Sequence, residues 1–335
     1  MRLLPAVLAL AVGCSGGGPE TGGGGAAAGS GAAGGGEAGG GEAGGRAATP
    51  SATGTAPGAA ADHPAAPAGP ACRAMPFAAS LDLPEASGAV WVEPSFGLPA
   101  HLIVVSDSGN HGAFAVVDAK SGAELGSGQL PLERGVSDDL EGLARAGGVY
   151  YALTSGGYMR HFRRTGAARF ELAVPAYALP GASCDSPRRG NCGRDLEGLC
   201  LADPLPATGC AGFAASRRDG ELVCLQVGAG GRLRPEPSQT IRFALPMTLS
   251  DCNIAPAAAG GALHAATNGF GGNTLLLVHG WHDPATARVE IVPGHATGFI
   301  EAVAAGPGGA IYRFSDNGGP ASPMFADSCP QAGPE

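Results

Sequence analysis

The sequence has few basic side chains. Its 20 Lys and Arg residues are outnumbered by 29 Asp and Glu residues, which gives a formal net charge of −9 at pH 7. Nucleic acid requires a basic protein surface to neutralise its phosphates. The charge balance therefore argues against a nucleic-acid partner.

Several signatures of catalytic and metal sites are also missing. None of the nine cysteines forms a CxxC pair, which argues against a zinc ribbon or a thioredoxin-like redox site. Neither a GxSxG elbow nor an SxxK motif occurs in the part expected to fold, so a serine hydrolase has no specific support. No long segment has the 3.6-residue apolar period of a helix, which favours β-structure.

The N-terminus has the layout of a secretory signal peptide. Arg2 precedes the apolar run Leu3–Val12, and small residues lead to Cys14. The run is too short for a permanent membrane span, and its end resembles a bacterial lipobox. We predict a lipoprotein signal peptide at 1–13 and a lipidated Cys14, which places the protein in the cell envelope as an outer-membrane or cell-surface lipoprotein. The alternative is ordinary signal cleavage, with Cys14 left to pair elsewhere.

A long segment of small residues follows. Residues 14–70 are almost wholly Gly, Ala, Ser, Thr and Pro, a composition that cannot bury enough apolar surface to fold. We interpret it as a disordered tether. Residues 71–335 are then the folded domain, which is large enough for one core.

A lipidated Cys14 leaves eight cysteines, an even number suited to disulfides in an oxidising compartment. Cys72 and Cys329 bracket the folded part, so a bridge between them would tie its ends together. Cys184 and Cys192 enclose a short polar loop and are expected to pair locally. The pairing of the other four is left open by the sequence: Cys200, Cys210, Cys224 and Cys252.

The pentapeptide DLEGL occurs twice, at Asp139–Leu143 and Asp195–Leu199. Aligned on its Glu, five stretches recur at intervals of roughly 50 residues. Each contains short apolar segments separated by Gly-rich turns. The reference positions are Ser87, Glu141, Glu197, Asn253 and Glu301.

A repeat of this length with three or four short strands is typical of a β-propeller blade. We predict an all-β propeller of five blades, with six as an alternative and a β-sandwich as the competing fold. The segment Met75–Pro84 precedes the first repeat. It would supply an outer strand to the last blade and so close the ring, fastened by a Cys72–Cys329 disulfide.

The acids of the repeat open the innermost strand of each blade, which lines the propeller axis. Residues i and i+2 share one face of a strand, so paired oxygen ligands would converge on the axis. Carboxylate and amide oxygens suit Ca²⁺ more readily than Mg²⁺. The predicted metal ligands are Asp139, Glu141, Asp195, Glu197, Asp251, Asn253 and Glu301.

Two further interpretations of polar residues near the axis stay open. Individual acids of the ligand set could instead cap turns or hydrogen-bond the backbone between blades. The turns Ser106–Asn110 and Ser315–Asn317, each after a second strand, could add oxygens that face the axis.

Four motifs carry a family resemblance. The runs Glu85–Gly88 (EASG), Val104–Asn110 (VVSDSGN), Asp138–Ala144 (DDLEGLA) and Tyr150–Gly157 (YYALTSGG) resemble bacterial propellers described as phytase-like or esterase-like, and are similar to SdiA-regulated propeller proteins. The resemblance implies a secreted or periplasmic propeller with an acidic, calcium-binding axial site at the ligands named above.

Two functions follow as hypotheses. In the first, a calcium-dependent hydrolase cleaves an ester or phosphoester of a small-molecule substrate, with Glu141 and Glu197 as ligand or general base. In the second, a non-catalytic propeller binds a protein or carbohydrate partner at the cell surface. In both, the protein is a monomer that meets the membrane through its lipid anchor.

Overall fold

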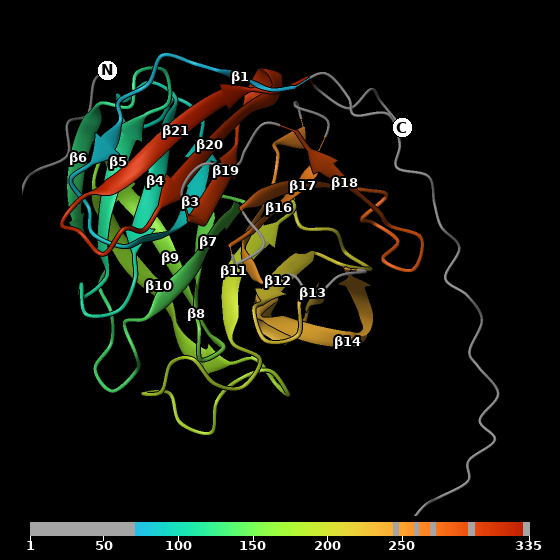
Figure 1. Ribbon diagram of the computed structural model, residues 1–335. Helices are drawn as coiled ribbons and strands as arrows, with labels where there is room; N and C mark the ends of the chain where they lie inside the picture. Colours follow the sequence, from blue (N-terminus) through green and yellow to red (C-terminus); the bar gives the residue numbers. More distant parts are fainter. Residues whose placement is uncertain (1–70, 244–247, 258–260, 269–272, 294–298, 331–335) are drawn as a thin grey trace, which may run out of the picture. The chain divides into compact units, whose positions relative to one another are not determined.

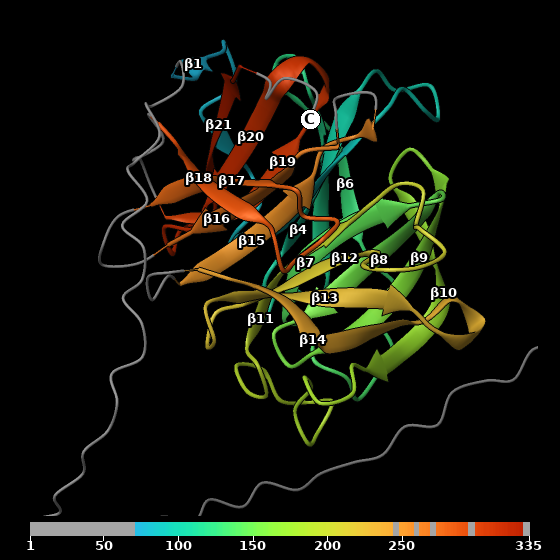
Figure 2. The ribbon, with the colours of Figure 1, turned by 90° about the vertical axis from the view of Figure 1, so that its right-hand side faces the viewer.

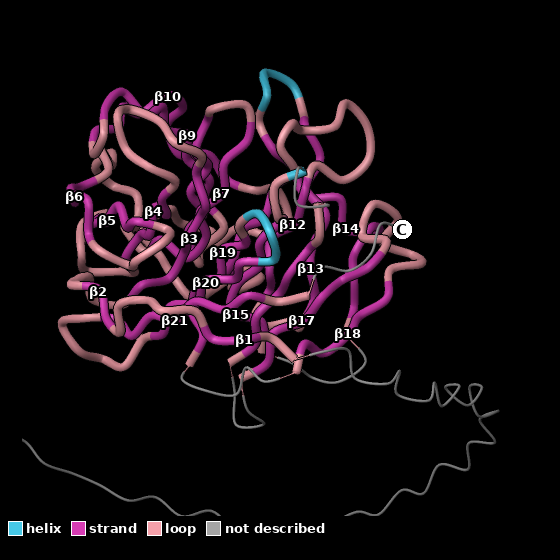
Figure 3. Tube along the Cα trace, turned by 90° about the horizontal axis from the view of Figure 1, so that it is seen from above, coloured by secondary structure: helices cyan, strands magenta, loops and turns pink. Residues whose placement is uncertain are grey.

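The computed structural model describes residues 71–243, 248–257, 261–268, 273–293 and 299–330. The predicted signal peptide, Cys14 and the tether lie outside these residues. The described chain is built from short antiparallel strands, and its helical content is limited to single turns such as η1 (Ala229–Gly231) and η3 (Pro307–Gly309) (Figure 3). In this part of the chain no helix has the length and apolarity that a membrane span requires.

Five antiparallel sheets form the blades of a β-propeller (Figures 1 and 2). Blade 1 comprises β3 (Ala86–Val92), β4 (His101–Ser106), β5 (Ala113–Asp118) and β6 (Glu124–Gln129). Blade 2 comprises β7 (Leu140–Ala146), β8 (Val149–Thr154), β9 (Tyr158–Gly166) and β10 (Arg169–Ala178). Blade 3 comprises β11 (Leu196–Leu201), β12 (Gly212–Ser216), β13 (Glu221–Val227) and β14 (Leu233–Arg242).

Blade 4 comprises β15 (Leu249–Ile254), β16 (Leu263–Thr267), β17 (Thr274–His279) and β18 (Arg288–Val292). Blade 5 comprises β19 (Ile300–Ala305), β20 (Ala310–Ser315) and β21 (Ser322–Ser328). The first strand of each blade lies beside the first strands of the two neighbouring blades, and β19 lies beside β3. The ring therefore closes with five blades, as predicted.

The N-terminal end of the domain completes the last blade. Strands β1 (Arg73–Ala74) and β2 (Ser80–Leu81) both pair with β21. The predicted closure by an N-terminal strand is thus confirmed, although the outermost strand β1 lies just before the segment expected to supply it. The Cys72–Cys329 disulfide joins the two ends beside this closure.

Three more disulfides stabilise the described part of the domain. Cys184–Cys192 closes the polar loop, as predicted. The four cysteines that the sequence left unassigned form Cys200–Cys252 and Cys210–Cys224. The first of these joins β11 to β15, so it fastens blade 3 to blade 4 near the axis.

Apolar side chains fill the space between consecutive blades, because each blade buries both of its faces against its neighbours. Each of the five core clusters draws its residues from two adjacent blades. Edge-to-face contacts between aromatic rings stabilise two of these interfaces. Phe114 of blade 1 packs on Phe170 of blade 2 with ring centroids 5.1 Å apart, and Phe213 of blade 3 meets Trp281 beyond β17 at 6.1 Å.

The first strand of every blade carries a β-bulge at its second residue. We call these residues the bulge ring: Ser87, Glu141, Glu197, Ser250 and Glu301. A bulge leaves one residue unpaired and turns its side chain out of the normal alternation. The predicted equivalence of Asn253 is wrong, because Ser250 holds that position in blade 4. Turns of unequal length between the blades shift the true period at that point.

Glycine follows the bulge where the first strands approach most closely. A Cβ on Gly142 would lie 2.5 Å from the Leu199 backbone nitrogen, and one on Gly198 would lie 2.5 Å from Asp251 Cα. A side chain at either position would collide with the backbone of the next blade. The glycine of DLEGL is therefore a packing requirement.

We expect Gly142→Ala to lower the free energy of unfolding by about 3 kcal/mol, the upper range for overpacked sites, since backbone atoms must move to admit the methyl group. Urea unfolding measures the loss. Gly126→Ala in β6 is the control, because its Cβ would meet only Ala168 Cβ at 3.5 Å. Equal stability of the two variants would contradict the close approach.

Candidate functional site

A second ring of polar side chains faces the bulge ring. The residue that follows the second strand of each blade forms this turn ring: Asp107, Ser155, Arg217, Asn268 and Asp316. In four blades its backbone N–H donates to the carbonyl two residues before the bulge, for example Asp107 N–H to Glu85 O at 2.9 Å and Arg217 N–H to Asp195 O at 2.8 Å. This repeated hydrogen bond brings both rings to the same end of the axis.

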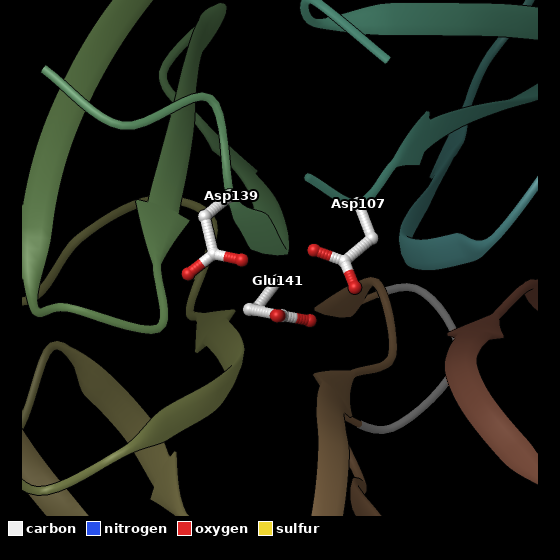
Figure 4. A group of neighbouring side chains, drawn as sticks. All are labelled: Asp107, Asp139 and Glu141. Carbon is white, nitrogen blue, oxygen red and sulfur yellow. The ribbon is translucent and has the colours of Figure 1, made fainter. Parts of the chain in front are cut away.

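Three carboxylates, one from blade 1 and two from blade 2, come together at this end of the axis. Asp107 follows β4, Asp139 precedes β7, and Glu141 is the bulge residue of β7. One oxygen from each lies within 4.8 Å of the others, and Figure 4 shows the three side chains pointing toward one another. We call this group the acid triad. Of the predicted ligands, the structure brings Asp139 and Glu141 together here.

The acid triad is crowded and largely hidden from water. Burial, and then the nearby charge of Asp139, raise the pKa of Asp107 to about 6. Burial followed by the charges of Glu197 and Asp107 raises the pKa of Glu141 well above its ordinary value. Among the described residues, none forms an ion pair with any of the three carboxylates. Both shifts record the cost of ionising several acids in one small volume.

Beside the acid triad, the two rings contain two more glutamates, Glu197 and Glu301, and one arginine, Arg217. Arg217 Nη2 lies 2.6 Å from Glu197 Oε2 and 3.8 Å from Glu301 Oε2. Asn268 Nδ2 donates to Glu301 Oε1 at 2.5 Å. Even so, burial raises the pKa of Glu197 to about 8 and that of Glu301 to about 7, in opposition to the guanidinium, which lowers both.

The charges at this end of the axis do not balance. The two rings contain five carboxylates and one guanidinium, that of Arg217, and Asp139 adds a sixth carboxylate. Protons or a bound cation must therefore supply the missing positive charge. Several buried atoms here also have no hydrogen-bond partner among the described residues. They are Glu197 Oε1, Ser250 Oγ and Asp195 Oδ1. Such groups are costly to bury, and a ligand at the axis would satisfy them.

Two predicted ligands are engaged in holding the blades together. The Asp251 carboxylate accepts hydrogen bonds from the backbone N–H groups of Val303 and Cys252, both at 2.7 Å. Asn253 Oδ1 accepts from Ala305 N–H at 3.0 Å, while its Nδ2 donates to Ala89 O at 3.4 Å. Asp251 and Asn253 thus join first strands of different blades, as the alternative interpretation of these acids proposed.

Asn253 belongs to the opposite end of the axis. It lines a cavity of about 220 Å³ where the first strands end, together with Trp91, Arg145 and Asp203. Arg145 Nη1 pairs there with Glu93 at 2.8 Å. The hydrogen bond from Asn253 to Ala89 crosses the axis from blade 4 to blade 1, so the centre of the ring is packed.

Asp107 shows what the sequence could and could not reveal. The pattern of polar residues and glycine after each second strand marked the turns. Asp107 comes close to Asp139 because of two features of the fold. They are the bulge at Glu141 and the backbone hydrogen bond from Asp107 to Glu85. Neither feature can be recognised in this sequence.

Comparison with known proteins assigns no functional site to this chain. No protein-family model and no curated protein sequence matches the chain. Among solved structures it is similar to a glutaminyl cyclase from Myxococcus xanthus, with 17% identity over 77% of this chain and 96% of that one and a TM-score of 0.44. It is also similar to the PQQ-bound aldose sugar dehydrogenase from Streptomyces coelicolor, with 17% identity over 79% and 99% and a TM-score of 0.46. Likenesses this distant transfer no residue role or substrate, and the phytase-like resemblance stays a prediction.

Proposed function

We propose that this protein is a cell-envelope lipoprotein whose propeller binds Ca²⁺ at the acid triad and hydrolyses an ester or phosphoester there. One observation carries the proposal. Three converging carboxylates without an ion-pair partner among the described residues lie beside the buried oxygen of Glu197, which has no hydrogen-bond partner there either.

The donor set favours Ca²⁺ over other common cations. All three triad ligands are carboxylate oxygens, the donors that hard cations prefer. Ca²⁺ accepts more oxygen ligands than Mg²⁺ and in a more flexible geometry. Oxygens that all lie within 4.8 Å of one another are close enough to share one such ion, whose opposite ligands stand about 5 Å apart.

The remaining residues suit acid–base chemistry next to a cation. A bound Ca²⁺ would polarise an ester or phosphoester oxygen. Glu197 has a pKa of about 8 in the cation-free protein. A bound Ca²⁺ would lower that pKa, so that the carboxylate could accept a proton from water at Oε1, which has no hydrogen-bond partner among the described residues. Arg217 fixes the other oxygen of the same carboxylate. We assign Glu197 as the general base, and Glu141 as a calcium ligand.

The cysteines support a location outside the cytoplasm, because four disulfides in one domain require an oxidising compartment. The lipid anchor at Cys14 and the tether extend this proposal to the cell envelope. We expect Cys14→Ser to move the protein from the membrane fraction to the soluble fraction of fractionated cells. Retention of the variant in membranes would contradict the lipid anchor.

Hydrolysis has a direct test. Calcium-loaded protein is assayed on a panel of carboxylate esters and phosphate monoesters and diesters. Loss of a general base costs about 10²–10⁴ in kcat, so Glu197→Gln should lose at least 100-fold, while Glu236→Gln on the outer β14 should keep wild-type activity. Calcium binding without any hydrolysis on the panel would favour the non-catalytic propeller, and unchanged activity of Glu197→Gln would remove that residue from the mechanism.

A further inference from the structure

We infer that Ser155 is a positioning residue for the acid triad, and that the loop closed by Cys184–Cys192 holds it in place. The calcium affinity of the triad then depends on this disulfide. The inference rests on the proposed function, since it concerns how strongly the same site binds its cation.

Ser155 connects the loop to one triad carboxylate. Its Oγ–H donates a short hydrogen bond to Asp139 Oδ2, and the same Oγ accepts one from Asn191 N–H at 2.8 Å. The serine is fully buried. Because the accepted bond fixes the hydroxyl, its proton points at Asp139 rather than rotating. The orientation of Asp139 is thus set by the backbone of the loop that connects blade 2 to blade 3.

The loop is held against the site along its length. Cys184 N–H donates to Gly156 O at 2.9 Å, next to Ser155, and Ser137 N–H donates to Pro187 O at 2.7 Å, two residues before Asp139. The Cys184–Cys192 disulfide closes the segment that contains both Pro187 and Asn191. Breaking the disulfide would release Asn191, the residue whose N–H orients Ser155.

Gly190 shows how tightly this loop covers the triad. A Cβ at this position would lie 2.1 Å from Asp139 Oδ2 and 3.0 Å from Ser155 Oγ. Any side chain here would push the carboxylate out of its place. The loop therefore forms the wall of the site behind Asp139, and a cation must enter from the side of Asp107 and Glu141.

Such support matters because ligands held in the bound geometry lose less freedom when the ion binds, and the groups that orient them typically change metal affinity 10–100-fold. In the other blades the turn ring has a charged or amide side chain. Blade 2 has a serine, whose small size leaves room for Asp139 between the ring and the loop.

The test is calcium titration by calorimetry of the full domain. We expect Ser155→Ala to weaken calcium binding at least 10-fold, and Ser155→Thr, which keeps the hydroxyl, to recover most of the affinity. Ser322→Ala is the matched control. Ser322 is equally buried and also donates one hydrogen bond and accepts one, but its partners are Leu83 and Ala86. A structural role alone would lower the melting temperature of both alanine variants in chelator and leave their calcium affinity unchanged.

A second comparison keeps the inference testable if Ser155→Ala does not fold. The Cys184→Ser/Cys192→Ser protein should bind calcium at least 10-fold more weakly than wild type, and Cys210→Ser/Cys224→Ser should bind as wild type. Wild-type affinity in Ser155→Ala or in the loop-disulfide variant would overturn the inference and leave the calcium site intact. Absence of calcium binding in the wild type would instead overturn the proposed function.

Discussion

Between pH 6.5 and 8, the calcium-free protein is expected to lose about 2 kcal/mol of unfolding free energy, and saturating calcium should abolish the loss. In the unfolded chain a glutamate ionises near pH 4.5, whereas Glu197 has a pKa of about 8 in the folded protein. The native state therefore holds an extra proton through this window, and stability falls as the pH rises toward 8. One such proton is worth about 1.4 kcal/mol per pH unit.

The window is chosen so that the glutamates dominate. The buried His101 and His161 have lowered pKa values, whereas a histidine in the unfolded chain ionises near pH 6.5. Each of the two therefore opposes the loss by about 0.4 kcal/mol, nearly all of it below pH 7.5. Glu301, with a pKa of about 7, adds a smaller loss in the same direction. A calcium ion bound at the acid triad would add positive charge near both groups and would stabilise their ionised forms.

Urea unfolding at several pH values, with chelator and with calcium, measures this effect. Glu197→Gln should show a flatter profile in chelator, because its amide does not titrate. Glu236→Gln should keep the wild-type slope, since Glu236 is exposed. If the free energy of unfolding of the wild type in chelator stays constant or rises from pH 6.5 to 8, the pKa of Glu197 in the folded protein is not raised into this range.

The second large effect concerns the closure of the ring. Removing the Cys72–Cys329 disulfide with Cys72→Ser/Cys329→Ser should lower the free energy of unfolding by about 4–5 kcal/mol. The bridge joins residues 257 positions apart, and the entropy lost by the unfolded chain grows with the length of the loop. The disulfide also holds β1 against β21, because a strand of two residues forms too few hydrogen bonds to stay paired by itself.

Cys210→Ser/Cys224→Ser is the matched comparison, because its bridge spans 14 positions within one blade. That loop predicts a smaller loss of about 3 kcal/mol. Unfolding in urea without reductant measures both variants. An equal or smaller loss for Cys72→Ser/Cys329→Ser would mean that strand pairing alone closes the propeller.

The fold could be predicted further from the sequence than the site could. Short strands, a period near 50 residues and cysteines at both ends were enough to predict five blades and their closure. The role of the glycine in DLEGL became clear only in the structure, where a Cβ on Gly142 or Gly198 would collide with the backbone of the next blade.

The site is harder to predict because it depends on single-residue register. A bulge at the second residue of each first strand decides which side chain faces the axis, and a shift of three positions led the repeat to Asn253 instead of Ser250. Asp251 illustrates a second difficulty. Its carboxylate has the composition of a ligand, but backbone N–H groups of neighbouring strands already occupy it.

The most direct test of the account is calcium titration of wild type against Asp139→Asn/Glu141→Gln, by calorimetry after exhaustive chelation. The wild type is expected to bind calcium saturably, and the double variant to bind it at least 100-fold more weakly. The double variant should remain folded, because its substitutions remove buried negative charge. Indistinguishable titrations of the two proteins would contradict a calcium site at the acid triad.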